Sequence, residues 1–487
     1  MIKVYLNDML EHNHEYFVWI NPRYNLLNAR QVRPGEVLKV NKLTADSPFG
    51  HKAFLFKPAI EYNGTEKQKA QWLPLARSGK ILGTSAQAEL GHGSFVRGIE
   101  TTASFDPDTD EFVVHSRTIS STKFWPAGLG FWTPHKAVMA SGEDQDPHFF
   151  LMGDVGLKLG QLARDSTFTK DLLRARLSYS VMMLVRGRIP GIFTVELSQA
   201  LKIATRHSVV QQQGLGPADA LKDKASIFQC KHQHFRLLSM IAKTYAMFFG
   251  SRVCDEQYIK LREMQNENDH SLALCSRTDY WHEGMRHIRG YRWCRRRAQA
   301  VWWSRLYGYL RSTDIVGALS DGATFEGGNY VLWQQVGRHV LKQLDRLQDG
   351  EPIEPQLQYL TNVEDPNIPC SAFAMQFLDP QVQFAIYLDR VHRQLVKAHS
   401  AIRASTRLPG DAWNEHMMLL ISTSQAHIEY FILKSLIDTI SALRDTALSS
   451  LRTVLNRIRF LFAPFTIINS RTVDALSVVE TADAHSP

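Results

Sequence analysis

The sequence predicts an α+β protein that is mostly α-helical, with a β-rich middle part that follows a helical N-terminal segment. Residues 101–119 alternate between apolar and polar side chains around an Asp106-Pro107-Asp108 turn, which is typical of paired strands. From Leu172 onward, apolar residues recur at helical spacing. We therefore expect a helical bundle in the second half of the chain, with a second helical unit near residues 375–465.

The composition is that of a soluble globular protein. The chain has 487 residues, enough for two or three domains, and is 44% hydrophobic and 21% charged. Its formal charge of +8 suits an anionic partner. Five cysteines without a CxxC pair argue against a disulfide framework or a zinc site and predict a reducing compartment. No apolar run is long enough to span a bilayer, and no signal peptide is evident.

Individual elements follow from local patterns. Thr65 is expected to cap a short helix, with Gln68 three residues later completing a capping box. Further strands are predicted at 137–140 and 149–152. Pro190-Gly191 is expected to separate two helices. Helices are predicted at residues 177–188, 195–213, 227–260, 330–347, 384–399 and 416–462.

Two glycine-rich loops flank the predicted strands. Gly83–Gly93 is rich in small residues and in amide and hydroxyl groups, and Lys123–Gly130 combines aromatic residues with glycines. Glycine lets a backbone approach a flat polar ligand closely. The residues alone leave two interpretations open, a ligand-binding β-unit or a β-module with tight turns and no ligand.

Metal chemistry is not predicted. The tightest group among nineteen histidines is Lys231-His232-Gln233-His234, and histidines two positions apart do not share a helix face. The sequence contains no P-loop, GxSxG elbow or GxGxxG fingerprint.

Four motifs resemble those of the peroxisomal acyl-CoA oxidase family. That family carries G-T-x-A-Q-T-E-[LM]-G-H-G, R-G-[LI]-E-T-T-A and K-[WF]-W-P-G-G-L-G in this order, and these stand here at Gly83–Gly93, Arg97–Ala103 and Lys123–Gly130. Ala323–Asn329 resembles the family's A-x-[TC]-[FY]-E-G-[DE]-N. The resemblance runs from about residue 65 to 160 and again through 172–275 and 314–350.

The resemblance implies a fold of the acyl-CoA dehydrogenase/oxidase type. Its expected parts are a short N-terminal helical domain (1–79), a β-barrel-like middle domain (80–165), a helical bundle (166–350), a second helical domain (375–465) and a tail (466–487). Residues 1–40 match the family poorly, which predicts a truncated N-terminus. After Gly160 the family's next strand pair is missing, which predicts a deletion and an unpaired sheet edge.

The resemblance also implies a reaction, the FAD-dependent α,β-dehydrogenation of a fatty acyl-CoA with molecular oxygen as acceptor. Glu326 occupies the position of the catalytic base, which removes the α-proton of the thioester. Considered alone, Glu326 is better explained as a loop carboxylate that caps the helix beginning near Asn329, and the upstream motifs are what favour the base. A homodimer and a peroxisomal location are implied by kinship, although the chain ends in Ala484-His485-Ser486-Pro487 and not in an SKL-type signal.

Cofactor contacts are implied at eight positions. Five would lie beside the isoalloxazine: Gln87, Ala88, Glu89, Ala127 and Gly128. Arg206 resembles an arginine that meets the cofactor phosphate, and Gln335 and Arg338 resemble a pair near the neighbouring subunit's cofactor. The last three are equally ordinary polar residues on helix faces. The family usually has threonine at Ala88 and glycine at Ala127, so both contacts depart from its pattern.

Residues 276–311 stand apart, with nine arginines among four tryptophans. Three interpretations are open: nucleic-acid contact, a solvated basic helix face, or a segment translated out of frame. We favour the third, because a shift of one nucleotide at Val301–Tyr307 permits the Cys-Gly-Gly-His-Gly-Tyr that the family has here. The functional alternatives are an acyl-CoA dehydrogenase, a relic that only binds acyl-CoA, and, from this segment alone, a nucleic-acid binder.

Overall fold

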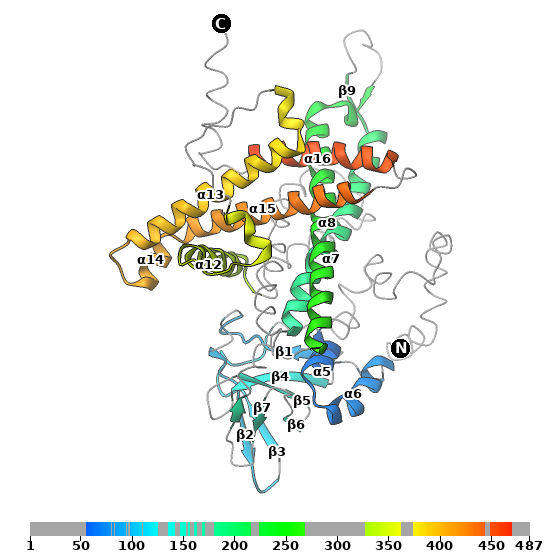
Figure 1. Cartoon of the computed structure of the whole chain (residues 1–487). Helices are drawn as coiled ribbons and strands as arrows, with labels where there is room; N and C mark the ends of the chain where they lie inside the picture. Colours follow the sequence, from blue (N-terminus) through cyan, green and yellow to red (C-terminus); the bar gives the residue numbers. More distant parts are fainter. Residues whose placement is uncertain are drawn as a thin grey trace. The chain divides into compact units, whose positions relative to one another are not determined.

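A computed structural model of the chain defines its architecture (Figure 1). It describes residues 55–78, 80–81, 83–93, 95, 98–109, 111–124, 135–141, 147–151, 154–155, 160–162, 168–170, 180–215, 224–267, 327–361, 374–443 and 449–469. The chain divides into two compact units, Met1–Val181 and Met182–Pro487. The finer domain boundaries expected from the sequence stay predictions.

Two helices, α5 (Lys57–Asn63) and α6 (Glu66–Ser78), begin the described part of the first unit. The capping box expected at Thr65 is confirmed. The amide of Gln68 donates to Thr65 Oγ1 at 3.3 Å, and the amide of Thr65 donates to Gln68 Oε1 at 3.0 Å. These helices bury an apolar cluster of Phe56, Ile60, Leu73 and Ala76 together with Ala137 of the sheet. Burial of this cluster attaches the helices to one face of the sheet.

The predicted strands are confirmed and form a mixed six-stranded sheet. The strands are β1 (Gly83–Ala86), β2 (Thr102–Asp106), β3 (Glu111–His115), β4 (His135–Ser141), β5 (Pro147–Leu151) and β6 (Asp154–Val155). They follow the order β3-β2-β4-β5-β6, and β1 also pairs with β4. The end strands β3 and β6 approach each other, but the described pairings do not close the sheet. The predicted barrel-like form is therefore not confirmed.

β1 and β2 lie one after the other along the same edge of β4. Ala86 at the end of β1 is opposite Val138, and Thr102 at the start of β2 is opposite Ser141, while β5 occupies the other edge. The chain between them, residues 87–101, therefore leaves the sheet edge and returns to it a few residues further along β4. This loop contains most of the first two motifs.

Strands also follow Gly160, where the motif comparison predicted that strands were lost. β7 (Gly160–Leu162) and β8 (Phe168–Lys170) pair antiparallel as a small two-stranded sheet. The sequence analysis did not predict this pair, and no described pairing joins it to the six-stranded sheet, so the expected deletion and unpaired sheet edge stay predictions.

The second unit begins with α7 (Ser180–Val210), a single helix that contains Pro190. The prediction that Pro190-Gly191 separates two helices is wrong. Proline removes one backbone hydrogen bond from a helix, but here the apolar positions on both sides of it are buried. They are Ile189, Phe193, Leu197 and Leu201. Tertiary packing of this face offsets the local preference of proline for a break.

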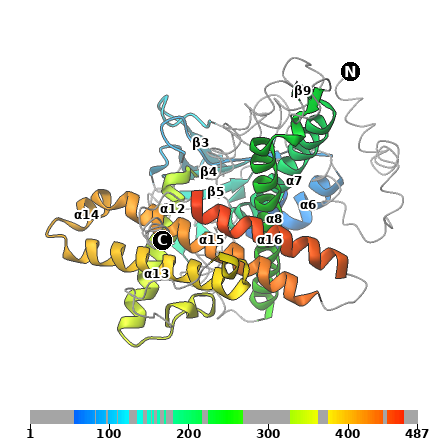
Figure 2. The ribbon, with the colours of Figure 1, turned by 90° about the horizontal axis from the view of Figure 1, so that it is seen from above.

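The remaining helices assemble around α15 (Met417–Ala442), which packs against four long helices and the short helix α14 (Pro409–Glu415) (Figure 2). The long helices are α8 (Lys231–Glu267), α12 (Asn329–Gln348), α13 (Pro380–Ala404) and α16 (Ser449–Asn469). Shorter elements connect them: β9 (Gln212–Leu215), β10 (Lys224–Ser226), η6 (Ile227–Gln229), η9 (Pro355–Thr361), η10 (Ala374–Leu378) and α14. The helical bundle predicted for the second half is confirmed.

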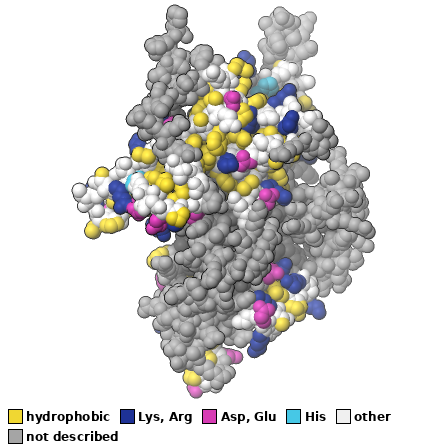
Figure 3. Space-filling model, in the orientation of Figure 1, with side chains coloured by type: hydrophobic (Ala, Val, Ile, Leu, Met, Phe, Trp, Pro, Cys, Tyr) yellow, Lys and Arg dark blue, Asp and Glu magenta, His cyan; other side chains and the backbone are white. Residues whose placement is uncertain are grey.

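Large apolar side chains remain exposed on the helical unit. α8 exposes Phe235 and Phe248, and α16 exposes Leu451 and Val454. Figure 3 shows hydrophobic side chains gathered on one face of the upper part of the molecule. Within the described part of the chain, no helix is apolar over a run long enough to cross a bilayer.

Candidate functional site

The two glycine-rich loops that flank the strands in sequence form one unit in the structure. The amide of Leu90 donates to the carbonyl of Thr122 at 2.9 Å, and the amide of Phe124 donates to the carbonyl of Ala88 at 3.1 Å. Glu89 and Lys123 thus face each other as an antiparallel bridge. Residues 88–91 of the first motif are paired with residues 120–124, where the third motif begins.

Gly91 explains part of the glycine pattern. Its amide donates to the carbonyl of Ser120 at 2.9 Å, and a Cβ built at this position would lie 2.9 Å from Ser120 Cβ. No real side chain tolerates such a contact, so glycine is needed where the two segments cross. This need comes from packing within the protein and requires no ligand.

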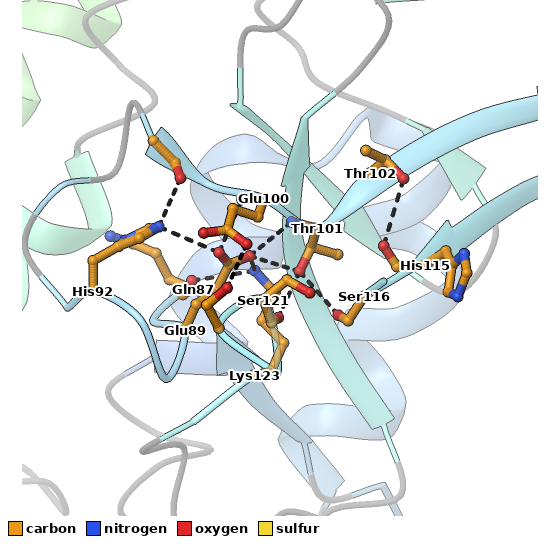
Figure 4. A network of polar contacts seen from close by, with 12 residues as sticks. Gln87, Glu89, His92, Glu100, Thr101, Thr102, His115, Ser116, Ser121 and Lys123 are labelled. Atoms are coloured by element: carbon orange, nitrogen blue, oxygen red, sulfur yellow. Dashed lines mark hydrogen bonds and ion pairs between the residues drawn. The ribbon is translucent and has the colours of Figure 1, made fainter. Parts of the chain in front are cut away.

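Glu89 is the centre of a buried polar network (Figure 4). The residue is only 3% exposed. Its Oε2 accepts the amide of Glu100 at 2.9 Å, and its Oε1 accepts both the amide of Thr101 at 2.9 Å and the Thr101 hydroxyl at 2.6 Å. Lys123 Nζ donates to the same Oε1 at 2.9 Å. A single carboxylate therefore ties the start of the 87–101 loop to its end and to the third motif.

The charges of this network are those of a buried ion pair. Burial alone raises the pKa of Glu89, but the hydrogen bonds from Thr101, Glu100 and Lys123 more than offset it and hold that pKa at about 2. Burial lowers the pKa of Lys123, and Glu89 opposes that shift. The Glu89 charge is thus stabilised first by Thr101 and Glu100 and then by Lys123, whereas Glu89 stabilises the charge of Lys123.

His92 orders the far part of the loop. Its Nε2 lies 2.7 Å from the carbonyl oxygen of Gly98 and 3.3 Å from Glu89 Oε2. A carbonyl can only accept, so Nε2 carries the hydrogen in this arrangement. The Gly91-His92 part of the first motif therefore has a structural role within the loop.

Three of the predicted flavin contacts lie together at this site. Gln87 and Ala88 are half-buried and come directly after β1, and Glu89 is the next residue. The amide N–H of Ala88 has no hydrogen-bond acceptor among the described residues. Within the same part of the chain, the hydroxyl of Thr84 is buried without a partner. The Ala88 donor suits a flat polar ring, whereas Thr84 is 0% exposed and does not contribute to a binding surface. Ala127 and Gly128 lie outside the described residues.

Glu326 also lies outside the described residues, and so does the basic segment 276–311. The structure describes the residues directly after Glu326. Gly327 has φ +110°, a conformation that favours glycine, and α12 begins at Asn329 as expected. The N-cap position is Gly328, which offers no side chain to cap the helix. The chain therefore turns sharply at Gly327, directly before the helix begins.

The other predicted residues belong to the second unit. Arg206 is exposed near the end of α7. Gln335 and Arg338 are one turn apart on α12, with Gln335 half-buried and Arg338 exposed. The guanidinium carbon of Arg338 lies 4.8 Å from the centroid of the Trp413 ring. Sequence reasoning did not identify Trp413, because no motif surrounds it.

Three family models match the chain, and all describe acyl-CoA oxidases. The acyl-coenzyme A oxidase N-terminal model matches residues 8–82, the acyl-CoA oxidase C-alpha1 domain matches residues 179–341, and the acyl-CoA oxidase model matches residues 379–480. Together they cover most of the chain. The first match begins at residue 8, so the expectation that residues 1–40 match the family poorly is wrong.

Curated relatives agree with these models. The chain is 26% identical to peroxisomal acyl-coenzyme A oxidase 1 of Mus musculus over 488 residues, which covers 86% of this chain and 71% of the relative. It is 27% identical to the putative peroxisomal acyl-coenzyme A oxidase 1.2 of Arabidopsis thaliana, with 85% and 70% covered.

Solved structures share the fold. Arabidopsis thaliana acyl-CoA oxidase 1 superposes with a TM-score of 0.82 at 22% identity, over 98% of this chain and 80% of the other. Acyl-CoA oxidase-2 of Caenorhabditis elegans, bound with FAD, ascaroside-CoA and ATP, gives 0.81 at 22% identity, over 97% and 75%. This chain belongs to the acyl-CoA oxidase family of oxidoreductases. The family, its fold and the enzyme class expected from the sequence motifs are confirmed.

Proposed function

We propose that this protein oxidises a fatty acyl-CoA to the trans-2-enoyl-CoA, with FAD as cofactor and molecular oxygen as acceptor, in the first step of peroxisomal fatty acid β-oxidation. The observation that carries the proposal is the pairing of the first and third motifs into one unit. That pairing leaves the Ala88 amide without an acceptor among the described residues. The family membership of the chain supports the same reaction.

The FAD contacts that we propose are those that the family resemblance implies. Gln87, Ala88, Glu89, Ala127 and Gly128 are proposed to contribute beside the isoalloxazine, and Arg206 toward the cofactor phosphate. Gln335 and Arg338 are proposed to lie near the cofactor of the neighbouring subunit. When bound, FAD accepts the β-hydrogen as hydride and then reduces oxygen to hydrogen peroxide. Ala88 has no side-chain donor, so its backbone N–H is the hydrogen bond that this position can offer.

Glu326 is the proposed base. The α-proton of a thioester is weakly acidic, and a positioned carboxylate that accepts it lowers the barrier to its removal. The residue stands directly before Gly327, whose positive φ turns the chain into α12.

A homodimer and a peroxisomal location complete the proposal. The exposed apolar side chains of α8 and α16 are of the kind that a protein interface covers. Curated relatives from animals and plants are named peroxisomal acyl-CoA oxidases, which supports the location.

The test is an assay with purified protein reconstituted with FAD. Peroxide release from palmitoyl-CoA in air is compared with reduction of an artificial dye without oxygen. We expect yellow protein that releases peroxide. Dye reduction without peroxide in air identifies a dehydrogenase. Protein that binds acyl-CoA but no FAD identifies a non-catalytic relic, and either outcome rejects the proposed oxidase.

A further inference from the structure

We propose that Glu89 and Lys123 act together as positioning residues, which turn the peptide between Gln87 and Ala88 so that the Ala88 N–H is presented to the flavin. The inference rests on the proposed function and deepens it. It assigns the Glu89 side chain an internal role in place of direct contact with the isoalloxazine ring.

The Glu89 carboxylate has no capacity left for a ligand. Oε1 accepts three hydrogen bonds, two from Thr101 and one from Lys123. Oε2 accepts the Glu100 amide and lies 3.3 Å from His92 Nε2. A carboxylate offers about four lone-pair sites, so these donors saturate it. The side chain is 0% exposed, which excludes it from a binding surface.

Lys123 connects this carboxylate to the peptide that precedes it. Its Nζ donates to Glu89 Oε1 at 2.9 Å and to the backbone carbonyl of Gln87 at 3.3 Å. The Lys123 side chain is 12% exposed, so neither bond competes strongly with water. Glu89 thereby fixes the ammonium group, and the ammonium group fixes the direction of the Gln87 carbonyl.

Peptide planarity passes that direction on to Ala88. The carbonyl of Gln87 and the amide of Ala88 belong to the same trans peptide, in which C=O and N–H point in opposite directions. Because Lys123 holds the carbonyl on its own side, the Ala88 N–H points away from the ion pair. That N–H has no acceptor among the described residues, as a donor reserved for a ligand requires.

The peptide that follows Ala88 is also fixed by a hydrogen bond. The Ala88 carbonyl accepts the amide of Phe124 at 3.1 Å. Both peptides that flank Ala88 are thus oriented by Lys123 and its neighbour. The residue carries only a methyl group, so its flavin contact depends on this backbone arrangement.

The experiment compares FAD affinity in the full-length holoprotein and its variants. Glu89→Gln removes the charge that fixes Lys123, and Lys123→Met removes the donor to Gln87. The dissociation constant is measured by flavin fluorescence titration, and the visible circular dichroism of the bound flavin reports its environment. We expect each variant to weaken FAD binding about tenfold, the equivalent of losing one well-made hydrogen bond between neutral groups. The double variant should be no weaker than either single one, because both changes release the same peptide.

Two matched controls separate positioning from general destabilisation. Glu100→Gln alters a neighbouring carboxylate that is exposed and bonds Thr118 and Ser120, and we expect unchanged affinity. Ala137→Gly weakens the buried contact between the sheet and the N-terminal helices, and we expect lower stability with an unchanged flavin spectrum.

Each outcome has one meaning. Wild-type affinity and spectrum in Glu89→Gln overturn the inference while leaving the proposed function intact. Equal losses of FAD affinity in Glu89→Gln and Ala137→Gly also overturn it, because lower protein stability would then explain the weaker binding. Failure of the wild-type protein to bind FAD rejects the proposed function itself.

Discussion

Trp413 and Arg338 form a pair that joins α14 to α12. The guanidinium carbon of Arg338 lies 4.8 Å from the centroid of the Trp413 ring, within the range of a cation–π contact. The indole Nε1 of Trp413 also donates to Gln334 Oε1 at 2.8 Å. Gln334 and Arg338 are one turn apart on the same face of α12, so both contact the Trp413 side chain. The helical region after residue 375 thus helps hold a residue that we propose for cofactor binding.

This pair predicts a measurable coupling. Arg338→Ala and Trp413→Ala form a double-mutant cycle, and we expect a coupling free energy of about 0.5–1 kcal/mol in urea unfolding, typical of an exposed cation–π contact. Trp413→Phe keeps the ring and should retain most of the coupling while losing the bond to Gln334. Additive effects of the two alanine changes would show that the contact contributes nothing.

Replacement of Glu326 by glutamine is expected to slow turnover strongly without loss of FAD. General acid–base catalysis contributes about 10²- to 10⁴-fold, so kcat for palmitoyl-CoA should fall by that factor. Glu351→Gln serves as the control, since Glu351 is an exposed carboxylate paired with Arg346 after the end of α12. Turnover of Glu326→Gln at the rate of the control would remove Glu326 from the mechanism.

Two glycines within helices should respond in opposite ways to alanine. A Cβ at Gly337 on α12 would lie 3.0 Å from Ser424 Oγ and 3.2 Å from the Leu420 carbonyl oxygen of α15. We expect Gly337→Ala to destabilise the protein by about 1–3 kcal/mol through overpacking. A Cβ at Gly191 on α7 would meet nothing nearer than Ser251 Oγ at 3.4 Å. Gly191→Ala should gain up to about 1 kcal/mol from helix propensity.

Urea unfolding of both variants measures this difference. If Gly337→Ala proves as stable as Gly191→Ala, then α12 and α15 are not packed as closely as the structure shows.

Acid should destabilise the helical unit through His427. Burial, with a smaller contribution from nearby His339, holds the pKa of His427 at about 3, below its ordinary value of 6.5. Between these values the unfolded chain binds a proton that folded His427 does not. Stability therefore falls as the pH drops from 6.5 toward 3, by about 1.4 kcal/mol per pH unit for one such group.

His427→Gln tests this dependence. Glutamine does not titrate, and its amide can donate to or accept from the Tyr359 hydroxyl, which is hydrogen-bonded to His427 Nδ1. We measure the free energy of unfolding in urea between about pH 4 and 6. Its slope against pH should be smaller in this variant than in the wild type by the equivalent of one bound proton. His232→Gln, at an exposed position on α8, should leave the slope unchanged. If the unfolding free energy of His427→Gln has the same pH dependence as that of the wild type, then another group causes the loss of stability in acid.

Prediction from the sequence succeeded where the signal is local. The Thr65–Gln68 capping box, the hairpin of β2 and β3 and the start of α12 each depend on a few consecutive residues. Prediction failed at Pro190, where the intrinsic preference of proline for a helix break is outweighed by the burial of Ile189 and Phe193. It also missed the strand pair β7–β8, because these short strands have no extended alternation.

The sequence by itself determined the family, the proposed base and the position of both glycine-rich loops, because contiguous motifs carry that information. Only the tertiary structure decided that these loops pair and that Glu89 faces inward. Glu89 meets Lys123 across 34 positions, and Trp413 meets Gln334 across 79. Contacts over such separations leave no periodic pattern in the chain. A buried carboxylate such as Glu89 is stable only with hydrogen-bond donors around it, and the tertiary fold brings distant donors such as Lys123 into contact with it.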